Sequence, residues 1–287
     1  MPPSTCGPTA PEFAPSLREV IARHGLSARR SLGQHFLLDT NLIQRIVRAA
    51  GPLGGQHVLE VGPGPGGLTR GLLASDAASV TVVEIDRRAV AAMQELSVQV
   101  GGRLRVIDGN AMSLDLASLV PAPRHVVANL PYNIGTPLLV GWLRHAHEFE
   151  RLTLMFQQEV AERICAVSNT PAYGRLAVLS QWVCAVELLL RIPPTAFVPP
   201  PKVYSAVVGL VPHAVQPEPE LFRAMERLTA AAFGQRRKML RSALKGLGGE
   251  VLLRAAGIGS DRRGEALSVA EFDRLARLLA TAGPQTA

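Results

Sequence analysis

Val126-Val127-Ala128-Asn129-Leu130-Pro131-Tyr132 is the stretch that determines how the chain is interpreted: an apolar run that ends in a polar turn. Earlier in the chain, the glycine-rich turn Gly62-Pro63-Gly64-Pro65-Gly66-Gly67 follows a second apolar run, 58–61. Short apolar runs of this kind are typical of buried strands in a parallel sheet. Because ligands bind beyond the carboxyl ends of such strands, we expect the two turns to form one binding site.

Strands and helices alternate along most of the chain. Strands are predicted over 58–61, 80–84, 104–107, 124–128, 152–156, 176–186 and 205–211. Helices are predicted over 17–23, 42–47, 68–74, 87–96, 136–145 and 158–167, and then over 221–233, 236–244, 251–256 and 269–280. This order predicts an α/β domain with a largely parallel sheet, followed by a small all-helical domain. We expect a disordered tail at 1–15, the α/β domain at 16–212 and the helical domain at 213–287.

Composition narrows the class of protein. The 287 residues carry a net charge of +7, which favours a polyanionic partner. Three scattered cysteines form neither a disulfide framework nor a zinc motif, so we expect no metal and a reducing, cytoplasmic compartment. The N-terminus does not resemble a signal peptide. The longest apolar region, 176–192, is interrupted by polar residues and is not expected to span a membrane.

The glycine turn suits a nucleotide-bearing ligand, because glycine lets the backbone approach the ligand closely. Gly62, Gly64 and Gly67 also match the G-x-G-x-x-G pattern of dinucleotide-binding proteins, which keeps that class as an alternative. Pro63 and Pro65 argue against it, since they remove two amide donors from a pyrophosphate cradle.

Two polar residues follow the next strands along the chain. Glu84 ends the second strand, where a carboxylate can accept hydrogen bonds from both hydroxyls of a ribose. We expect this side chain to face solvent. Asn110 follows the third strand and can donate to an adenine ring nitrogen and accept from the adenine amino group. Without the glycine turn, Glu84 would be interpreted as a solvated strand end and Asn110 as a turn residue.

The segment that begins at Asn129 has the groups needed to activate an adenine amino nitrogen, whose lone pair is delocalised into the ring. The Asn129 side-chain oxygen and the Leu130 carbonyl can accept its two protons, while Tyr132 offers a face for an extruded base. Phe197, beside the rigid run Pro199-Pro200-Pro201, is a candidate for a second stacking face, although ordinary packing explains it equally well. The residues together predict methyl transfer to an adenine amino group.

The chain resembles the bacterial small-subunit ribosomal RNA adenine dimethyltransferases, the kasugamycin-sensitivity family. The motifs that carry this resemblance are 32–37, 60–64, 83–84, 129–132, 158–160, 173–176, 196–202 and 233–238. The resemblance implies a Rossmann-like S-adenosylmethionine-dependent methyltransferase sheet. It also implies dimethylation of two adjacent adenosines in the 3′-terminal hairpin of 16S rRNA, late in assembly of the small ribosomal subunit.

The resemblance also implies which side chains contact S-adenosylmethionine. These residues are His35, Leu37, Gly62, Glu84, Asn110 and Asn129. His35 stands where the family usually has Asn, and Asn110 stands where it usually has Asp. Both side chains can still form hydrogen bonds, so we expect cofactor binding with an altered affinity or pH dependence.

A basic segment lies within the predicted helical domain. Its cationic residues are Arg236, Arg237, Lys238, Arg241 and Lys245. In a continuous helix, positions 237, 241 and 245 share one face, and such a stripe suits phosphate contacts on structured RNA. A solvated helix face is the alternative. Arg29-Arg30 is a candidate for a second RNA contact.

Three other functions are weighed against this interpretation. The antibiotic-resistance methyltransferases of 23S rRNA share the cofactor and Asn-Leu-Pro-Tyr motifs, but segments 196–202 and 233–238 favour the 16S substrate. A non-catalytic factor for assembly of the small subunit is supported only by His35 and Asn110. A dehydrogenase is disfavoured because no second mononucleotide-binding half is visible. We expect a monomer that acts on 16S rRNA in the small ribosomal subunit.

Overall fold

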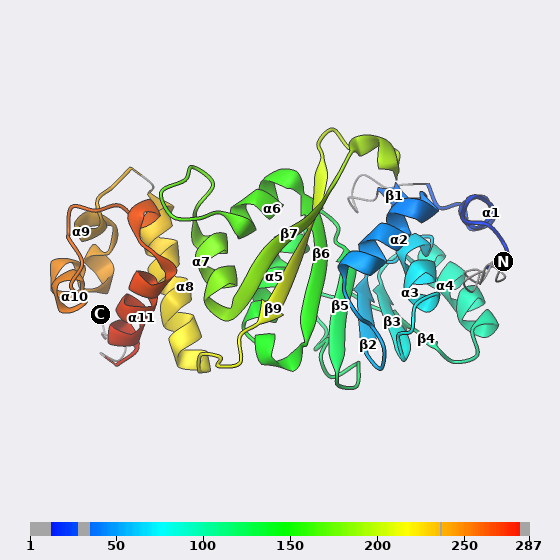
Figure 1. The fold of residues 1–287 in the computed structure, drawn as a ribbon, viewed down its shortest axis with the longest axis horizontal. Coiled ribbons are helices and arrows are strands. Elements are labelled where there is room, and N and C mark those ends of the chain that lie inside the picture. The colour runs from blue at the N-terminus through cyan, green and yellow to red at the C-terminus, as the bar shows by residue number, and fades with distance from the viewer. Residues whose placement is uncertain (1–12, 28–34, 236, 282–287) are drawn as a thin grey trace, which may run out of the picture. The chain divides into compact units, whose positions relative to one another are not determined.

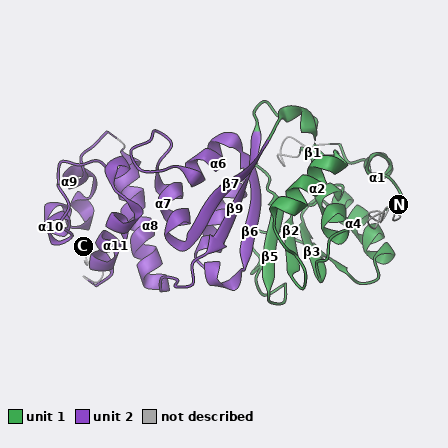
Figure 2. Ribbon diagram, in the orientation of Figure 1, with its two compact units in different colours: residues 1–133, 192–204 green, residues 134–191, 205–287 purple. Residues whose placement is uncertain are grey.

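The computed structural model describes residues 13–27, 35–235 and 237–281 (Figure 1). The chain forms two compact units (Figure 2). Unit 1 comprises Met1–Asn133 and Ile192–Tyr204, and unit 2 comprises Ile134–Arg191 and Ser205–Ala287. The chain therefore leaves unit 1, returns to it for one short segment, and leaves again. Residues 1–12 of the predicted disordered tail lie outside the described residues.

Unit 1 contains the parallel strands that precede the two motifs. These are β2 (His57–Val61), β3 (Ser79–Glu84), β4 (Leu104–Asp108) and β5 (Arg124–Asn129). They follow the order β4-β3-β2-β5, with Val58 opposite Val80 and His57 opposite Arg124. Val58, Val80 and Val126 are completely buried, as expected for strands of a sheet covered on both faces.

Helices and a small second sheet complete unit 1. The helices are α1 (Leu17–Arg23), α2 (Thr40–Ala49), α3 (Gly67–Leu73) and α4 (Arg87–Gln99), with the 3₁₀ turn η3 (Pro194–Ala196). The small sheet pairs β1 (Phe36–Leu37) antiparallel with β8 (Phe197–Val198). Asp39 and Asp86 begin α2 and α4 because each side chain accepts a backbone N–H of the first turn.

Unit 2 contains the remaining strands and the C-terminal helices. Its strands are β6 (Arg151–Gln157), β9 (Ser205–Pro212) and β7 (Cys184–Ile192), in the order β6-β9-β7, and β6 runs antiparallel to β9. Its helices are α5 (Gly135–Leu143), α6 (Gln158–Cys165), α7 (Arg175–Val183), α8 (Pro219–Gly234), α9 (Leu240–Ala243), α10 (Gly249–Ala255) and α11 (Val269–Thr281). Its 3₁₀ turns are η2 (Ala146–Glu148), η4 (Lys245–Leu247) and η5 (Gly264–Ala266). The α/β class with a helical C-terminal region is confirmed.

Polar contacts join the C-terminal helices to the earlier helices of the same unit. The Trp182 Nε1–H donates to Asp273 at 2.9 Å, which links α7 to α11. Glu226 of α8 forms ion pairs with Arg144 at 2.8 Å and Arg175 at 3.3 Å. Since β9 ends at Pro212 and α8 begins at Pro219, the secondary structure changes near the predicted domain boundary at 212–213, which stays a prediction.

The predicted strand at 176–186 is wrong over most of its length. The structure has α7 from Arg175 to Val183, and β7 begins only at Cys184. The residues Ala177, Val178, Leu179 and Val183 are completely buried. A continuous apolar run does not show the period that separates a buried helix from a buried strand, so the pattern is ambiguous here.

The predicted continuous helix at 236–244 is also wrong. Helix α8 ends at Gly234, and α9 covers only Leu240–Ala243. The Leu240 N–H donates to the Arg262 carbonyl at 2.7 Å and the Arg241 N–H to the Ser260 carbonyl at 3.1 Å. These two N–H groups therefore bond to a distant segment instead of to the carbonyl groups four residues earlier, as they would in a continuous helix. Positions 237, 241 and 245 therefore do not form one helical stripe.

Candidate active site

The structure brings the glycine turn and the Asn-Leu-Pro-Tyr segment into direct contact. Gly62 and Gly64 have positive φ angles of 71° and 55°, which favour glycine. The Gly62 N–H donates to the Val83 carbonyl at 2.9 Å and holds the turn against β3. A Cβ atom on Gly62 would lie 3.4 Å from Pro131 Cγ, so the turn lies directly against the end of β5.

Strand β1 lies across the same turn. A Cβ atom on Gly64 would meet the Phe36 ring at 3.3 Å, and one on Gly67 would lie only 2.4 Å from the Leu37 carbonyl oxygen. Glycine at position 67 is therefore required by this close approach of backbone to backbone. Leu37 pairs with Phe197 of β8, which places the returning segment 192–204 beside the turn.

His35 and Tyr132 extend this contact to aromatic rings. Their ring centroids are 5.4 Å apart, at an interplanar angle of 32°. His35 Nδ1 lies 2.8 Å from the Pro199 carbonyl; since a carbonyl only accepts, this nitrogen carries the proton. Asn129 Nδ2 donates to the His35 carbonyl at 3.5 Å. The predicted residues His35, Asn129 and Tyr132 thus lie together.

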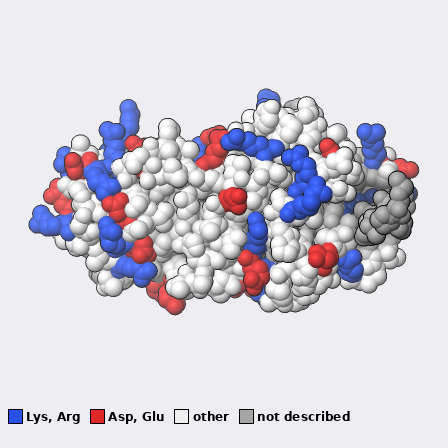
Figure 3. All heavy atoms as spheres, in the orientation of Figure 1, with Lys and Arg blue, Asp and Glu red and all other residues white. Residues whose placement is uncertain are grey.

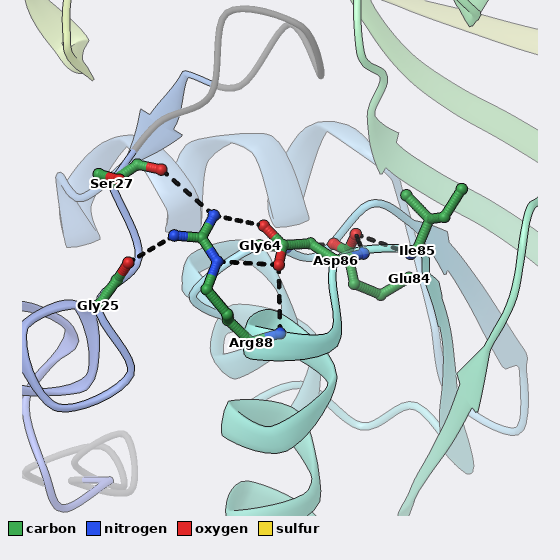
Figure 4. A network of polar contacts seen from close by, with 7 residues as sticks. All are labelled: Gly25, Ser27, Gly64, Glu84, Ile85, Asp86 and Arg88. Carbon is green, nitrogen blue, oxygen red and sulfur yellow. Dashed lines mark hydrogen bonds and ion pairs between the residues drawn. The ribbon is translucent and has the colours of Figure 1, made fainter.

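Glu84 is buried rather than solvent-facing, which corrects our expectation for this strand end. Its Oε2 accepts from the Gly64 N–H at 3.2 Å, and its Oε1 accepts from the N–H groups of Ile85 and Asp86 at 2.8 and 2.9 Å (Figure 4). Burial raises the pKa of Glu84, and the backbone hydrogen bonds oppose that shift. Each carboxylate oxygen can accept two hydrogen bonds. Oε1 accepts two and Oε2 accepts one, so one acceptor position on Oε2 is left for a ligand.

Glu60, inside β2, is a second buried carboxyl group that the sequence analysis did not single out. It is 1% exposed and accepts the Thr69 Oγ1–H at 2.7 Å. Burial raises its pKa to about 8, the Thr69 hydrogen bond opposes the shift, and the nearby charge of Glu84 raises it further. Glu60 is therefore largely protonated at neutral pH.

Asn110 is exposed, and its Oδ1 accepts the Met112 N–H at 3.0 Å in a local turn. Its amide N–H groups are the part of the side chain left to face a ligand. Two apolar residues that the sequence analysis missed lie nearby: Ile85 is 54% exposed and Met112 is 46% exposed. They follow β3 and β4, whose last residues Glu84 and Asp108 are paired. For Ile85, the available signal was an apolar residue directly after the polar strand end Glu84.

Leu130 and Phe197 are both buried, at 1% and 2% exposure. The role predicted for Leu130 uses its backbone carbonyl, so burial of the side chain is compatible with it. The role predicted for Phe197 uses its ring face, and stacking on a base requires that ring to move from its buried position. Both roles stay predictions.

The described basic residues at 237–245 are all exposed. They are Arg237, Lys238, Arg241 and Lys245, and within the described chain none of them forms an ion pair. Arg236 and the predicted second contact Arg29-Arg30 lie outside the described residues. Figure 3 shows Lys and Arg side chains over the region of helices α8 to α11, with Asp and Glu side chains between them.

A cavity of about 1230 Å³ lies along α2, α3 and residues 13–19. Of the residues around the glycine turn, Gly67 and Leu38 line it, whereas Glu84 and Asn129 do not. Strand ends and backbone contacts, rather than this cavity, therefore locate the candidate site. Across the described ranges, we find no cluster of His, Cys, Asp or Glu suited to a metal ion. Among the helices described, none has the length and apolar character needed to cross a membrane.

The buried Glu60 carboxyl predicts a pH-dependent stability. Its folded-state pKa of about 8 is above its ordinary value of 4.5, so the folded state keeps a proton that the unfolded chain has lost. This contribution is fully present below pH 4.5 and decreases toward pH 8, by at most about 1.4 kcal/mol per pH unit. We expect Glu60→Gln to reduce that decrease. Denaturant unfolding of both proteins at pH 5, 6, 7 and 8 measures it, and parallel pH curves would contradict the assignment.

Comparison with known proteins agrees with this geometry. The family model described as "Ribosomal RNA adenine dimethylase" matches residues 25–281. The chain is 61% identical over 271 residues to "Ribosomal RNA small subunit methyltransferase A" of Gluconobacter oxydans, covering 94% of this chain and 89% of that protein.

Two solved structures share the fold. A dimethyladenosine transferase from Plasmodium falciparum is 26% identical with a TM-score of 0.73, covering 87% of this chain and 98% of that one. The 23S rRNA methyltransferase ErmE is 27% identical with a TM-score of 0.63, covering 85% and 99%. Since the family model spans nearly the whole chain, the chain belongs to the ribosomal RNA adenine dimethylase family of S-adenosylmethionine-dependent methyltransferases.

Proposed function

We propose that this chain dimethylates the N6 amino groups of two adjacent adenosines in the 3′-terminal hairpin of 16S rRNA, in the small ribosomal subunit. The contact between Gly62 and Pro131 carries the proposal, because it joins a cofactor turn to a base-binding segment. The name of the Gluconobacter oxydans relative supports the small subunit as the substrate. We further propose that the protein acts as a monomer in the cytoplasm, where ribosomal subunits are assembled.

The described residues fit S-adenosylmethionine. Glu84 keeps one acceptor position for a ribose hydroxyl, and Gly62 and Gly64 let the backbone approach the ligand. Exposed Ile85 and Met112 offer apolar surface for the adenine ring, beside the Asn110 amide. The bound cofactor supplies an electrophilic methyl group on a sulfonium centre.

The chain's own contribution to the reaction is to hold the target amino group. Because Asn129 Nδ2 is directed at the His35 carbonyl, Oδ1 is left to accept a proton of the adenine amino group. The Leu130 carbonyl accepts the second proton in this proposal. The Tyr132 ring, half-buried and tilted against His35, provides a stacking face on a fixed support.

Residues 16–212 form the methyltransferase domain and 213–287 the RNA-binding domain in this proposal. Four described cations at 237–245 support it, since they are exposed and unpaired within the described chain. Phosphate contacts on structured RNA need such side chains. Arg236 belongs to the same proposed contact by its position in the sequence.

The similarity to ErmE keeps 23S rRNA as the competing substrate. Labelled S-adenosylmethionine, incubated with isolated undermethylated small subunits and with large subunits, separates the two. We expect label at two adjacent adenosines of the 16S 3′-terminal hairpin. Label only in 23S rRNA would replace this proposal with the antibiotic-resistance type. Cofactor binding without any labelling would favour a non-catalytic factor for assembly of the small subunit.

Replacing Asn129 tests the chemical step. Asn129→Ala removes the side-chain acceptor for the amino group, and we expect at least ~100-fold lower turnover, similar to loss of one positioned transition-state contact. Asn133→Ala is the matched control, because Asn133 is exposed in the next turn of the chain. Single-turnover methylation of small subunits measures both variants. Turnover of Asn129→Ala near that of Asn133→Ala would refute the role.

Replacing Glu84 tests the cofactor site. We expect Glu84→Ala to weaken S-adenosylmethionine binding by roughly 1.5–3 kcal/mol, the scale of a charge-assisted hydrogen bond. It should also lower the free energy of unfolding, because three backbone N–H groups lose their acceptor. Glu84→Gln keeps an acceptor oxygen and should lose less stability. Calorimetry and denaturant unfolding measure the two effects, and unchanged affinity in both variants would place the ribose contact elsewhere.

Reversing Arg237 and Arg241 tests the RNA contact. The double change to Glu should weaken binding to small subunits and reduce the slope of log affinity against log salt by roughly 0.7–0.9 for each lost phosphate contact. The control is Arg254→Glu with Arg274→Glu, which makes the same charge change at two exposed residues of α10 and α11. Filter binding at several salt concentrations measures both. Equal losses in the two double variants would indicate a general charge effect.

A further inference from the structure

The Arg88 guanidinium connects the loop after Glu84 to a second segment of unit 1 (Figure 4). Its Nε donates to Asp86 Oδ1 at 3.0 Å and its Nη2 to Asp86 Oδ2 at 2.7 Å, a bidentate arrangement. The same group donates from Nη1 to the Gly25 carbonyl at 2.5 Å and from Nη2 to the Ser27 carbonyl at 3.4 Å. One side chain therefore holds a carboxylate and two carbonyl groups from another part of unit 1.

Asp86 is the link between Arg88 and the proposed cofactor carboxylate. Its side chain is only 3% exposed, so its charge requires a partner, and Arg88 supplies one. The Asp86 backbone N–H donates to Glu84 Oε1 at 2.9 Å. Fixing the Asp86 side chain therefore also fixes one of the donors that orient Glu84.

The carbonyl groups of Gly25 and Ser27 belong to the segment that follows α1. Gly25 has a positive φ of 58°, and Leu26 between them is 1% exposed, so this segment is anchored in the core of unit 1. Further along the chain, Phe36 lies against Gly64. Arg88 thus holds the Glu84–Asp86 loop and the segment from Gly25 to Ser27 in one arrangement.

We propose that Arg88 is a positioning residue for cofactor binding: it holds the segment at Gly25 and Ser27 against the loop that orients Glu84. The proposal rests on S-adenosylmethionine as the cofactor of this site. Arg88 touches neither cofactor nor RNA in this role. It acts through the two backbone segments, and its loss should affect affinity for the cofactor more than the rate of methyl transfer.

The adjacent residue provides a matched control. Arg87 lies in the same first turn of α4 but is exposed, and within the described chain it forms no ion pair. Arg87→Gln makes the same charge change at the same helix end as Arg88→Gln. Arg88→Lys is the conservative variant, which keeps a cation near Asp86 but lacks the fork that reaches both Asp86 and the carbonyl groups.

Calorimetry on the full chain tests the proposal with S-adenosylmethionine and with S-adenosylhomocysteine, which lacks the sulfonium charge. We expect Arg88→Gln to weaken binding of both ligands about tenfold, as for loss of a charge-assisted hydrogen bond. Arg88→Lys should be intermediate and Arg87→Gln unchanged. At saturating cofactor, kcat on small subunits should change less than about twofold. Hydrogen exchange of a peptide covering 24–27 should be faster in Arg88→Gln alone.

Several outcomes would overturn the proposal. Unchanged cofactor affinity, with or without lower thermal stability, would leave Arg88 a purely structural role. Equal weakening of cofactor binding in Arg87→Gln would indicate a long-range charge effect. Cofactor affinity of Arg88→Lys equal to that of the unmodified protein would show that the contacts with the Gly25 and Ser27 carbonyl groups do not matter. If the unmodified protein fails to bind S-adenosylmethionine, the cofactor assignment itself fails. If it binds and Arg88→Gln binds equally well, only this inference fails.

Discussion

The Glu84 carboxylate is the interaction on which the site depends. A buried carboxylate is costly unless donors surround it, and here the N–H groups of Gly64, Ile85 and Asp86 do so. The bond from Gly64 joins the turn after β2 to the end of β3, and the bonds from Ile85 and Asp86 orient the carboxylate within its own loop. With the turn fixed, Gly62 lies against Pro131 and Gly67 lies beneath the Leu37 carbonyl. The Gly64 bond to Glu84, together with the Gly62 bond to the Val83 carbonyl, therefore holds the turn in the position where these close approaches occur.

The two buried carboxyl groups near the turn act differently because their surroundings differ. Glu60 has the Thr69 hydroxyl as its donor, and burial raises its pKa to about 8. Glu84 has three backbone donors that oppose the effect of burial on its pKa. The charge of Glu84 in turn raises the pKa of Glu60. Glu60 is therefore largely protonated at neutral pH, whereas the backbone N–H donors stabilise the charged form of Glu84 against the effect of burial.

The sequence predicted the strands that follow from local residue patterns, but it did not predict features that depend on tertiary contacts. The strands at 58–61 and 80–84 are confirmed, because short apolar runs with β-branched residues favour buried strands. The glycine turn contacts Pro131, and the expected single binding site at the two motifs stays a prediction. The strand prediction failed at 176–186, because a uniformly apolar run shows neither the helical nor the strand period. The burial of Glu84 was also missed, because its backbone donors come from two separate loops. Ile85 and Met112 were missed because an exposed apolar residue gains meaning only beside a binding site.

The basic segment shows most clearly why spacing alone was insufficient. The Arg241 N–H donates to the Ser260 carbonyl, and the preceding Leu240 N–H donates to the Arg262 carbonyl. These bonds, rather than a helix that starts at 236, place Arg241. Arg262 is held in turn by Glu271, whose pKa that ion pair and its hydrogen bonds lower to about 2. Arg241 thus takes its position from tertiary contacts with the segment that precedes α11. A charge pattern set by tertiary structure suits a folded RNA, because such RNA is recognised by the placement of its phosphates rather than by base sequence.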